Sequence, residues 1–288
     1  MTDVQRYEAP TTLEAAAEIL KGGDVTILAG GTDLMPQSEA GRIRLKPVLM
    51  NIRRVAELRG IEKTDGMVRI GALTTITEIL ESDLIRDTLP VLAEAADRFA
   101  SGQIRNMGTI GGNICNASPA GDTLVPLLVL NAEVELAGKP NGHLATRRVA
   151  LADFLAGPGR TRREAHELLA AVVVPVPPEG FRARFAKFGT RPALDISAVS
   201  VAVGGVLHGG VFTDVRAAFG AVAPTPIRGP ATEAALEGKR LDDATIEAAA
   251  QAAHDEVRPI DDVRASAWYR REMIHSLTRK VLSHVADA

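Results

Sequence analysis

Apolar residues near the N-terminus recur with the period of an amphipathic helix and are followed by a short β-type run. The helix is predicted over residues 13–20, because Thr11 and Glu14 have capping-box spacing and Gly22–Gly23 can end it. Its apolar face comprises Leu13, Ala16, Ala17 and Leu20. Residues 25–28 then predict a strand that stops at a double glycine.

The helical period and the apolar runs typical of strands also predict the remaining elements. Thr75 and Glu78 repeat the capping-box spacing and predict a short helix ending near Leu80. Helices are also predicted at 90–100, 124–130, 243–257 and 265–285, and strands at 68–71, 132–136, 146–151, 168–174, 182–189, 196–207 and 211–222. The last two strands would meet at Gly209–Gly210 as a hairpin. Residues 101–122 are so rich in glycine that a long, shaped loop is expected there.

Strands and helices do not alternate regularly, and this pattern favours an α+β fold without internal repeats. The strand at 168–174 has the continuous apolar character of a buried strand. Pro175, Pro177 and Pro178 follow it and form the best linker candidate. We therefore predict one domain over 1–177 and a second over 178–288.

Composition and charge narrow the class of protein. The chain has 288 residues, of which 46% are hydrophobic and 24% charged. Its net charge of −3 does not indicate the basic surface that nucleic-acid binding requires. No apolar run approaches the ~20 residues that span a bilayer, and the first residues lack a signal-peptide pattern, so we expect a soluble, cytoplasmic protein. The lone Cys115 cannot form a disulfide within the chain or a thiolate-held cluster. The six histidines lack ligand spacing, so no metal site is expected.

Two glycine pairs are the strongest candidates for a binding site. Ala29–Asp33 follows a predicted strand, and Thr109–Asn113 lies inside the glycine-rich stretch. Glycines let successive backbone N–H groups turn toward one concavity, which is how a protein with few local cations can hold a diphosphate. Either pair alone is more simply a tight turn. The dinucleotide fingerprint G-x-G-x-x-G, a P-loop and a G-x-S-x-G elbow do not occur.

Four segments together resemble a known family. They are ILAGGTDLMPQ (27–37), IGALTTITEI (70–79), IRNMGTIGGNICNASPAGDTLVPLLVLNAEVEL (104–136) and FAKFGTRPALDISAVSVAV (185–203). In this order they are similar to the FAD-binding medium subunit of the molybdenum hydroxylases, the group of xanthine, carbon monoxide and nicotinate dehydrogenases. The resemblance implies a two-part FAD domain of the vanillyl-alcohol-oxidase type, with subdomains at about 1–57 and 58–177. A C-terminal α+β domain would follow it.

The resemblance also implies site residues. The two loops that clasp the FAD diphosphate correspond to Ala29, Gly30, Gly31, Thr32 and Asp33 and to Thr109, Ile110, Gly111, Gly112 and Asn113. Further cofactor contacts correspond to Phe99, Asp122, Leu169, Ala170 and Lys187, with the register at 169–170 open by one residue. No catalytic side chain is implied.

Several of these residues have simpler interpretations. Phe99 would by default be a core aromatic on an amphipathic helix, and Asp122 an N-cap for the helix beginning near Leu124. Cys115 is interpreted as a small buried side chain, because no base stands near it in the sequence. Tyr269–Arg271 is at least as well explained by a solvated helix face or a subunit contact as by a cofactor role.

By the resemblance, a large partner subunit holds a molybdopterin cofactor and a small one holds two [2Fe–2S] clusters. This chain's FAD would deliver their electrons to an external acceptor, such as NAD, a quinone pool or oxygen. The three kinds of subunit would assemble as a dimer of heterotrimers, that is, a heterohexamer. Two alternatives stay open. One is an independent FAD oxidoreductase of the same fold class with its own substrate, and the other is a non-catalytic scaffold or nucleotide sensor.

Overall fold

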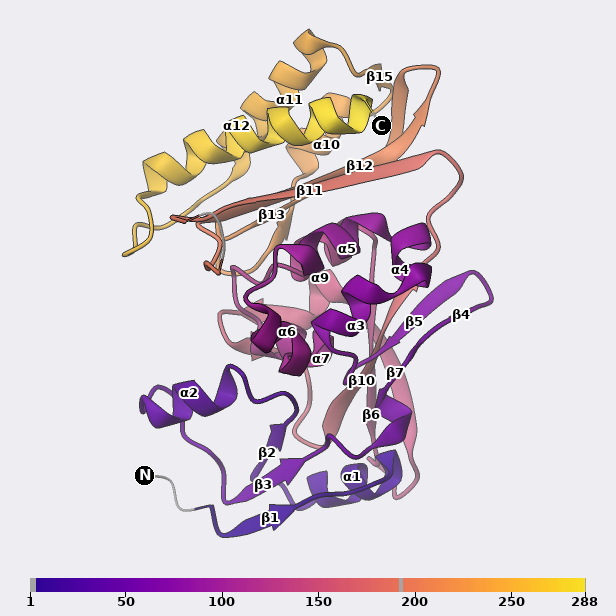
Figure 1. Cartoon of the computed structure of the whole chain (residues 1–288), viewed down its shortest axis with the longest axis vertical. Helices are drawn as coiled ribbons and strands as arrows, with labels where there is room; N and C mark the ends of the chain where they lie inside the picture. The colour runs from indigo at the N-terminus through magenta and orange to yellow at the C-terminus, as the bar shows by residue number, and fades with distance from the viewer. Residues whose placement is uncertain (1–3, 192–193, 288) are drawn as a thin grey trace.

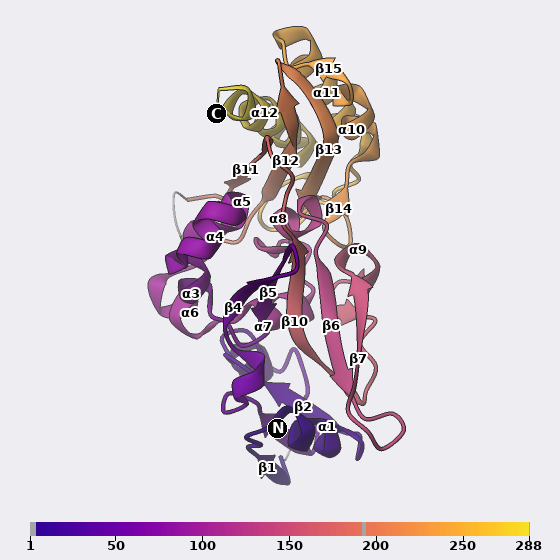
Figure 2. The same cartoon turned by 90° about the vertical axis from the view of Figure 1, so that its right-hand side faces the viewer.

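The computed structural model of the chain describes residues 4–191 and 194–287. Three sheets follow one another along the long axis of the molecule (Figure 1). A small N-terminal sheet lies at one end, a five-stranded sheet in the middle and the C-terminal sheet with its helices at the other end, an order that a second view preserves (Figure 2). Pro192 and Ala193, within the fourth family segment, lie outside the described residues.

The N-terminal sheet is parallel. Its strands, in spatial order, are β1 (Arg6–Glu8), β3 (Val48–Asn51) and β2 (Val25–Leu28). The helix α1 (Leu13–Leu20) confirms the predicted amphipathic helix, but Thr12 rather than Thr11 is its N-cap, because the Thr12 side chain accepts a hydrogen bond from the Ala15 amide. Glu14 consequently does not close a capping box and instead pairs with Lys139. The helix α2 (Leu34–Glu39), which the sequence pattern did not predict, follows β2.

The middle sheet is antiparallel and has a central strand buried on both faces, as its apolar run predicted. In spatial order its strands are β4 (Ile61–Thr64), β5 (Met67–Gly71), β10 (Glu167–Pro175), β6 (Glu133–Gly138) and β7 (Ala145–Ala150). The side chains of β10 divide between two cores: Leu169 packs into the main core, and Leu168 and Ala170 pack into the core beneath the N-terminal sheet. The strand therefore ties the two subdomains together.

Short helices cover the middle sheet. They are α3 (Ile76–Glu81), α4 (Asp83–Thr88), α5 (Pro90–Asp97), α6 (Gly102–Met107), α7 (Ile110–Asn116), α8 (Leu124–Val129) and α9 (Leu151–Phe154), with the 3-10 turn η1 (Ala56–Leu58) and the small strand pair β8 (Leu155–Gly157) and β9 (Arg160–Thr161). The capping box of Thr75 and Glu78 is confirmed at α3. The loop predicted over 101–122 is wrong in part, because Ser101 and Thr109 cap α6 and α7 within it.

The C-terminal half packs helices on one sheet. Its strands are β11 (Phe181–Phe188), β12 (Val199–His208), β13 (Val211–Gly220), β14 (Ile227–Arg228) and β15 (Lys239–Arg240), and its helices are α10 (Pro230–Leu236), α11 (Asp243–Glu256) and α12 (Ala267–Ala286). The predicted hairpin is confirmed at Gly209 and Gly210, whose φ angles of 57° and 81° suit a two-residue turn.

The two halves share buried apolar surface. The helix α8 is buried along its whole length, and its neighbours include β12 and β13. Ala183, Ala202 and Ala218 of the C-terminal sheet belong to the same core as the middle sheet. Within the described ranges, no helix combines the length and apolarity that crossing a bilayer would require.

Candidate functional site

The two glycine segments, about eighty residues apart in the sequence, touch in the structure. Gly30 lies against the backbone that leads into Thr109, and a Cβ atom added to Gly30 would stand 2.1 Å from the Met107 carbonyl oxygen. A Cβ atom on Gly108 would likewise lie 3.4 Å from the Thr32 hydroxyl oxygen. The glycine at position 30 is therefore required by a close crossing of two chain segments, which a simple turn does not explain.

The first segment presents a run of backbone donors. Within residues 4–191 and 194–287, none of the amide N–H groups of Ala29–Asp33 donates a hydrogen bond to the protein. Gly31 has a φ of 74°, in the left-handed region, which turns the chain sharply between β2 and α2. A loop with successive unpaired N–H groups is the arrangement that holds phosphate oxygens. The residues present thus fit the diphosphate that the resemblance implies.

The second segment differs from its sequence-based prediction. Its amides were expected to turn toward the same anion, but Ile110 and Gly111 donate to the carbonyl oxygens of Thr74 and Ala72, both at 3.0 Å. The Gly112 amide donates to the Thr109 hydroxyl at 3.1 Å, within the first turn of α7. These glycines are needed for packing: a Cβ atom on Gly111 would lie 2.7 Å from Ala72. What this segment can offer a ligand is side-chain groups.

Those side-chain groups are Thr109 and Asn113. The Thr109 hydroxyl accepts the Gly112 amide and keeps its own proton to donate. The Asn113 Oδ1 atom accepts a hydrogen bond of 2.7 Å from the Thr123 hydroxyl, which leaves the amide NH₂ group for another acceptor. The second segment therefore contributes a hydroxyl beside the crossing and an amide donor about one helical turn further along α7.

Asp122 and Lys187 form a nearly buried ion pair between the two halves of the chain. Lys187 Nζ donates to Asp122 Oδ2 at 2.7 Å, and the Ser197 hydroxyl donates to Asp122 Oδ1 at 2.6 Å. Burial raises the pKa of Asp122, while Lys187 and Ser197 oppose that shift. The N-cap interpretation of Asp122 is wrong, because Thr123 is the N-cap of α8. The structure thus joins two residues that the resemblance assigned separately.

Ser197 was missed by sequence reasoning. It is buried and lies just before β12, where its hydroxyl holds one carboxylate oxygen while Lys187 holds the other. Lys187 also donates to the Asp195 carbonyl oxygen at 3.2 Å. A serine that precedes an apolar strand carries no distinctive sequence signal, since its role depends on which residue the fold brings opposite it.

Phe99 is held in place from its backbone. The default interpretation placed Phe99 on an amphipathic helix, but it lies beyond the end of α5. The Arg105 Nη1 atom donates to the Phe99 carbonyl oxygen at 2.9 Å and to those of Asp97 and Ala100 at 3.4 Å each. Ala100 has a φ of 37°, an unfavourable conformation for alanine that this anchoring helps to maintain. The Phe99 ring is half-buried against the main core.

Leu169 and Ala170 lie at an irregularity of β10. The pairing with β6 shifts register between Leu169 and Ala171, so Ala170 is the bulged residue. Its carbonyl oxygen accepts the Ala72 amide at 2.9 Å, on the same short segment that receives Gly111. Both side chains are buried, so little of either is left to touch a ligand.

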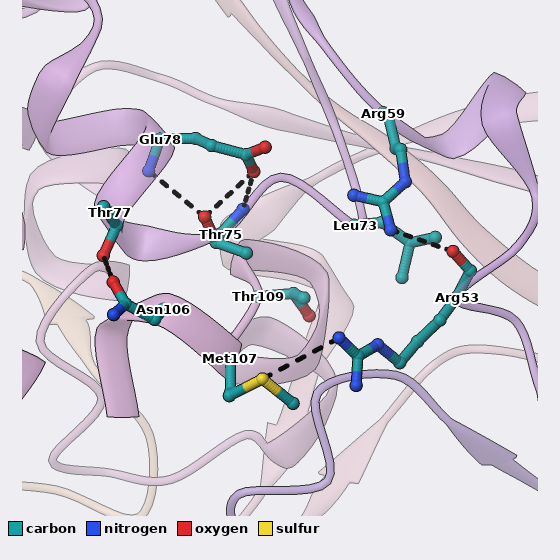
Figure 3. Close-up of a pocket in the computed structure, with 9 residues that line it drawn as sticks. All are labelled: Arg53, Arg59, Leu73, Thr75, Thr77, Glu78, Asn106, Met107 and Thr109. Carbon is teal, nitrogen blue, oxygen red and sulfur yellow. Dashed lines mark hydrogen bonds between the residues drawn. The ribbon is translucent and has the colours of Figure 1, made fainter. Parts of the chain in front are cut away.

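A pocket of about 300 Å³ adjoins the crossing (Figure 3). On one side it is lined by Arg53, Arg59 and Leu73. The other side is lined by Thr75, Thr77, Glu78, Asn106, Met107 and Thr109. Thr109 belongs both to the pocket and to the second glycine segment, and Met107 lines the pocket two residues before that segment. Sequence reasoning missed the two arginines, because they occur in a polar turn that the pattern left unassigned.

Other candidates have structural roles. Burial raises the pKa of the Cys115 thiol to about 11, which makes it a poor nucleophile at neutral pH. Arg270 is buried and donates to the carbonyl oxygens of Ala198 and Ala221, so the solvated-face interpretation does not hold for it. Among the described residues, no group of three or more His, Cys, Asp or Glu side chains is placed to hold a metal ion.

Two protein families match the chain, one over each half. A family described as "FAD binding domain in molybdopterin dehydrogenase" matches residues 2–177. A second, described as "CO dehydrogenase flavoprotein C-terminal domain", matches residues 184–285.

Individual relatives match over nearly their full length. The chain is 36% identical over 291 residues to a xanthine dehydrogenase FAD-binding subunit of Escherichia coli O157:H7, covering 100% of this chain and 98% of that one. It is 33% identical over 280 residues to a carbon monoxide dehydrogenase medium chain of Hydrogenophaga pseudoflava, covering 96% and 95%. A solved carbon monoxide dehydrogenase structure from Hydrogenophaga pseudoflava has a TM-score of 0.93 at 32% identity, covering 99% of this chain and 98% of that one.

These matches confirm the predicted fold class and the predicted oxidoreductase family. The agreement extends over both halves of the chain and over its three-dimensional course. The chain accordingly belongs to the FAD-binding medium subunits of the molybdenum hydroxylase family.

Proposed function

We propose that this chain binds one FAD across its two halves and serves as the electron-transfer subunit of a molybdenum hydroxylase. The observation that carries the proposal is the crossing at Gly30, where the loop with the unpaired amides of Ala29–Asp33 meets Met107 and Gly108, directly before Thr109. These groups would hold the diphosphate: five successive backbone donors from one segment, and a hydroxyl and an amide from the other.

The flavin ring would lie toward the Asp122–Lys187 pair. Lys187 carries a nearly buried ammonium group that can donate a hydrogen bond to a polar atom of the ring, while Asp122 and Ser197 fix its direction. Phe99 would supply an aromatic contact, and the bulge at Leu169 and Ala170 would line the site mainly with backbone. Ile110, Gly111 and Gly112, whose amides bond within the protein, would act only by positioning Thr109 and Asn113.

FAD, when bound, accepts electrons singly and releases them in pairs, so it can join one-electron and two-electron carriers. We infer that the electrons come from [2Fe–2S] clusters of a small partner subunit and leave to an external acceptor. Hydroxylation of the substrate would take place at a molybdopterin cofactor in a large partner subunit. The names of the relatives, a FAD-binding subunit and a medium chain, support the place of this chain as one subunit of a multi-subunit enzyme.

The assembly that follows is a dimer of heterotrimers in the cytoplasm. Co-expression of this chain with a large and a small partner subunit should yield a complex in which substrate reduces the flavin. The measurement is the bleaching of the flavin absorbance after anaerobic addition of substrate. If the isolated yellow chain oxidises a small organic substrate without partners, the electron-transfer role is wrong and an independent flavoenzyme takes its place.

A further inference from the structure

The threonine that begins α8 does not cap that helix with its side chain. Thr123 occupies the N-cap position, where a threonine hydroxyl usually accepts a hydrogen bond from one of the first backbone amides of the helix. No such bond forms here, because the backbone of Thr123 is itself helical, with a φ of −76° and a ψ of −20°. Thr123 is fully buried, so its hydroxyl needs a partner elsewhere.

That partner is Asn113, on the second glycine segment. The Thr123 hydroxyl donates to Asn113 Oδ1 at 2.7 Å. Asn113 is half-buried in α7, and in the described part of the chain no protein group accepts a hydrogen bond from its NH₂ group. The buried hydroxyl therefore holds one end of this amide and leaves the other end free.

The hydrogen bond decides which end of the amide is free. The oxygen and the NH₂ group of an asparagine differ little in size, so hydrogen-bond partners set the orientation of the side chain. Without the Thr123 donor, the amide can turn over at little steric cost and present its oxygen in place of its NH₂ group. Beside a diphosphate the difference has a sign: an NH₂ group donates to phosphate oxygens, whereas an amide oxygen is a second acceptor and repels them.

The preceding residue orients a donor from the other half of the chain. Asp122 holds Lys187 Nζ at 2.7 Å, so two adjacent residues of one buried turn each fix one donor. The turn is closed by its backbone: the Gly121 amide donates to the Ser118 carbonyl oxygen at 3.0 Å, and the Leu124 amide donates to the Gly121 carbonyl oxygen at 3.1 Å. The side chains at 122 and 123 consequently leave a backbone that is already fixed.

We propose that Thr123 is a positioning residue of the cofactor site, which sets the Asn113 amide so that its NH₂ group, and not its oxygen, faces the FAD diphosphate. The inference rests on the proposed function, because the FAD of that proposal is the ligand that Asn113 would meet. Thr123 is fully buried and would not touch the cofactor itself. The rival explanation is that Thr123 only fills space at the start of α8, where a valine would serve equally well.

Titration of the flavin-free chain with FAD, followed by flavin fluorescence, separates the two explanations. Thr123→Val keeps the shape of the side chain and removes the hydroxyl, so it should weaken FAD binding about tenfold, the effect of one lost hydrogen bond. Thr123→Ser keeps the hydroxyl and should bind FAD as the parent does. Thr278→Val is the matched control, because Thr278 is equally buried but its hydroxyl has no hydrogen-bond partner within the described residues.

A double-mutant cycle shows whether the effect passes through the amide. In the Asn113→Ala background, Thr123→Val should weaken FAD binding by less than about twofold, because no amide is left to orient. Asn113→Asp keeps an acceptor for Thr123 but replaces the NH₂ group with an oxygen, so it should bind FAD more weakly than Asn113→Ala does. This comparison tests the orientation of the amide even if Thr123→Val does not fold, which urea unfolding of the same samples shows.

Three results would overturn the positioning role and leave the proposed function standing. They are equal FAD affinity in the parent and a folded Thr123→Val, a tenfold loss that persists in full in the Asn113→Ala background, and an Asn113→Asp variant that binds FAD as tightly as Asn113→Ala. A folded parent chain that takes up no FAD would instead refute the proposed function, and the positioning role with it.

Discussion

Gly30 is a position where adding one side-chain atom would prevent the two glycine segments from touching. From the sequence alone this glycine is most simply part of a tight turn, yet the structure shows that any Cβ atom there would meet the Met107 carbonyl. A backbone atom cannot swing aside as a side chain can, so the two glycine segments would have to separate. At the residue scale, then, the site depends on close contact between backbones more than on particular functional groups.

We predict that Gly30→Ala weakens FAD binding at least tenfold and lowers the free energy of unfolding by about 2 kcal/mol, the usual cost of overpacking. Gly102→Ala is the control, because a Cβ atom at Gly102 meets no atom within 4 Å outside its chain neighbours and the backbone of its own helix. FAD fluorescence titration and urea unfolding measure the two effects. Normal FAD affinity in Gly30→Ala would show that the crossing is not part of the cofactor site.

The Asp122–Lys187 pair makes a second prediction. Asp122→Asn should lower the free energy of unfolding by about 3 kcal/mol, because it leaves the Lys187 ammonium without its counter-charge in a nearly buried place. Adding Lys187→Met should recover most of that loss, since no uncompensated charge is then left in the nearly buried site. FAD binding should be weakened in both variants, which separates the role in the cofactor site from the role in stability. Urea unfolding and FAD titration on the same samples provide the measurements.

At the scale of elements, the glycine-rich stretch shows where a sequence pattern misleads. Five glycines between 101 and 122 predict a loop, but α6 and α7 form there because Ser101 and Thr109 supply N-caps. Gly111 is required in α7 because the helix lies directly on Ala72 at that residue. Strands such as β10 and β12 were predictable since their apolar runs are long, whereas β1 has only three residues, two of them charged, and gives too short a signal.

The start of α12 is stabilised by a pH-dependent contact. Burial alone would raise the pKa of Asp262, but the Arg264 amide and the Arg270 guanidinium outweigh it and lower that pKa below its ordinary value. A lowered carboxyl pKa adds stability above its unfolded value of about 3.9, and that stability is lost as the pH falls through the folded value. Asp262→Asn should therefore be less stable than the parent by about 1 kcal/mol at pH 7. Thermal unfolding from pH 7 to pH 3 should show this difference shrinking below about pH 4, and a constant difference would contradict the assignment.

At the scale of the whole molecule, the order of elements and the family were accessible from the sequence, but the site was only partly so. The four family segments identify which stretches matter, and their spacing cannot show that Asp122 faces Lys187 from the other half of the chain. Ser197 and Arg105 act through carboxylate and carbonyl partners that only the folded chain brings near. The proposed boundary after residue 177 stays a prediction, and the shared core of α8 with β12 and β13 leads us to expect the halves to unfold together.

Titration of the purified, flavin-free chain with FAD measures directly whether this chain binds the cofactor. We predict saturation at one FAD per chain, with a flavin absorbance band that persists through gel filtration. A folded chain that stays colourless after incubation with excess FAD would contradict the account.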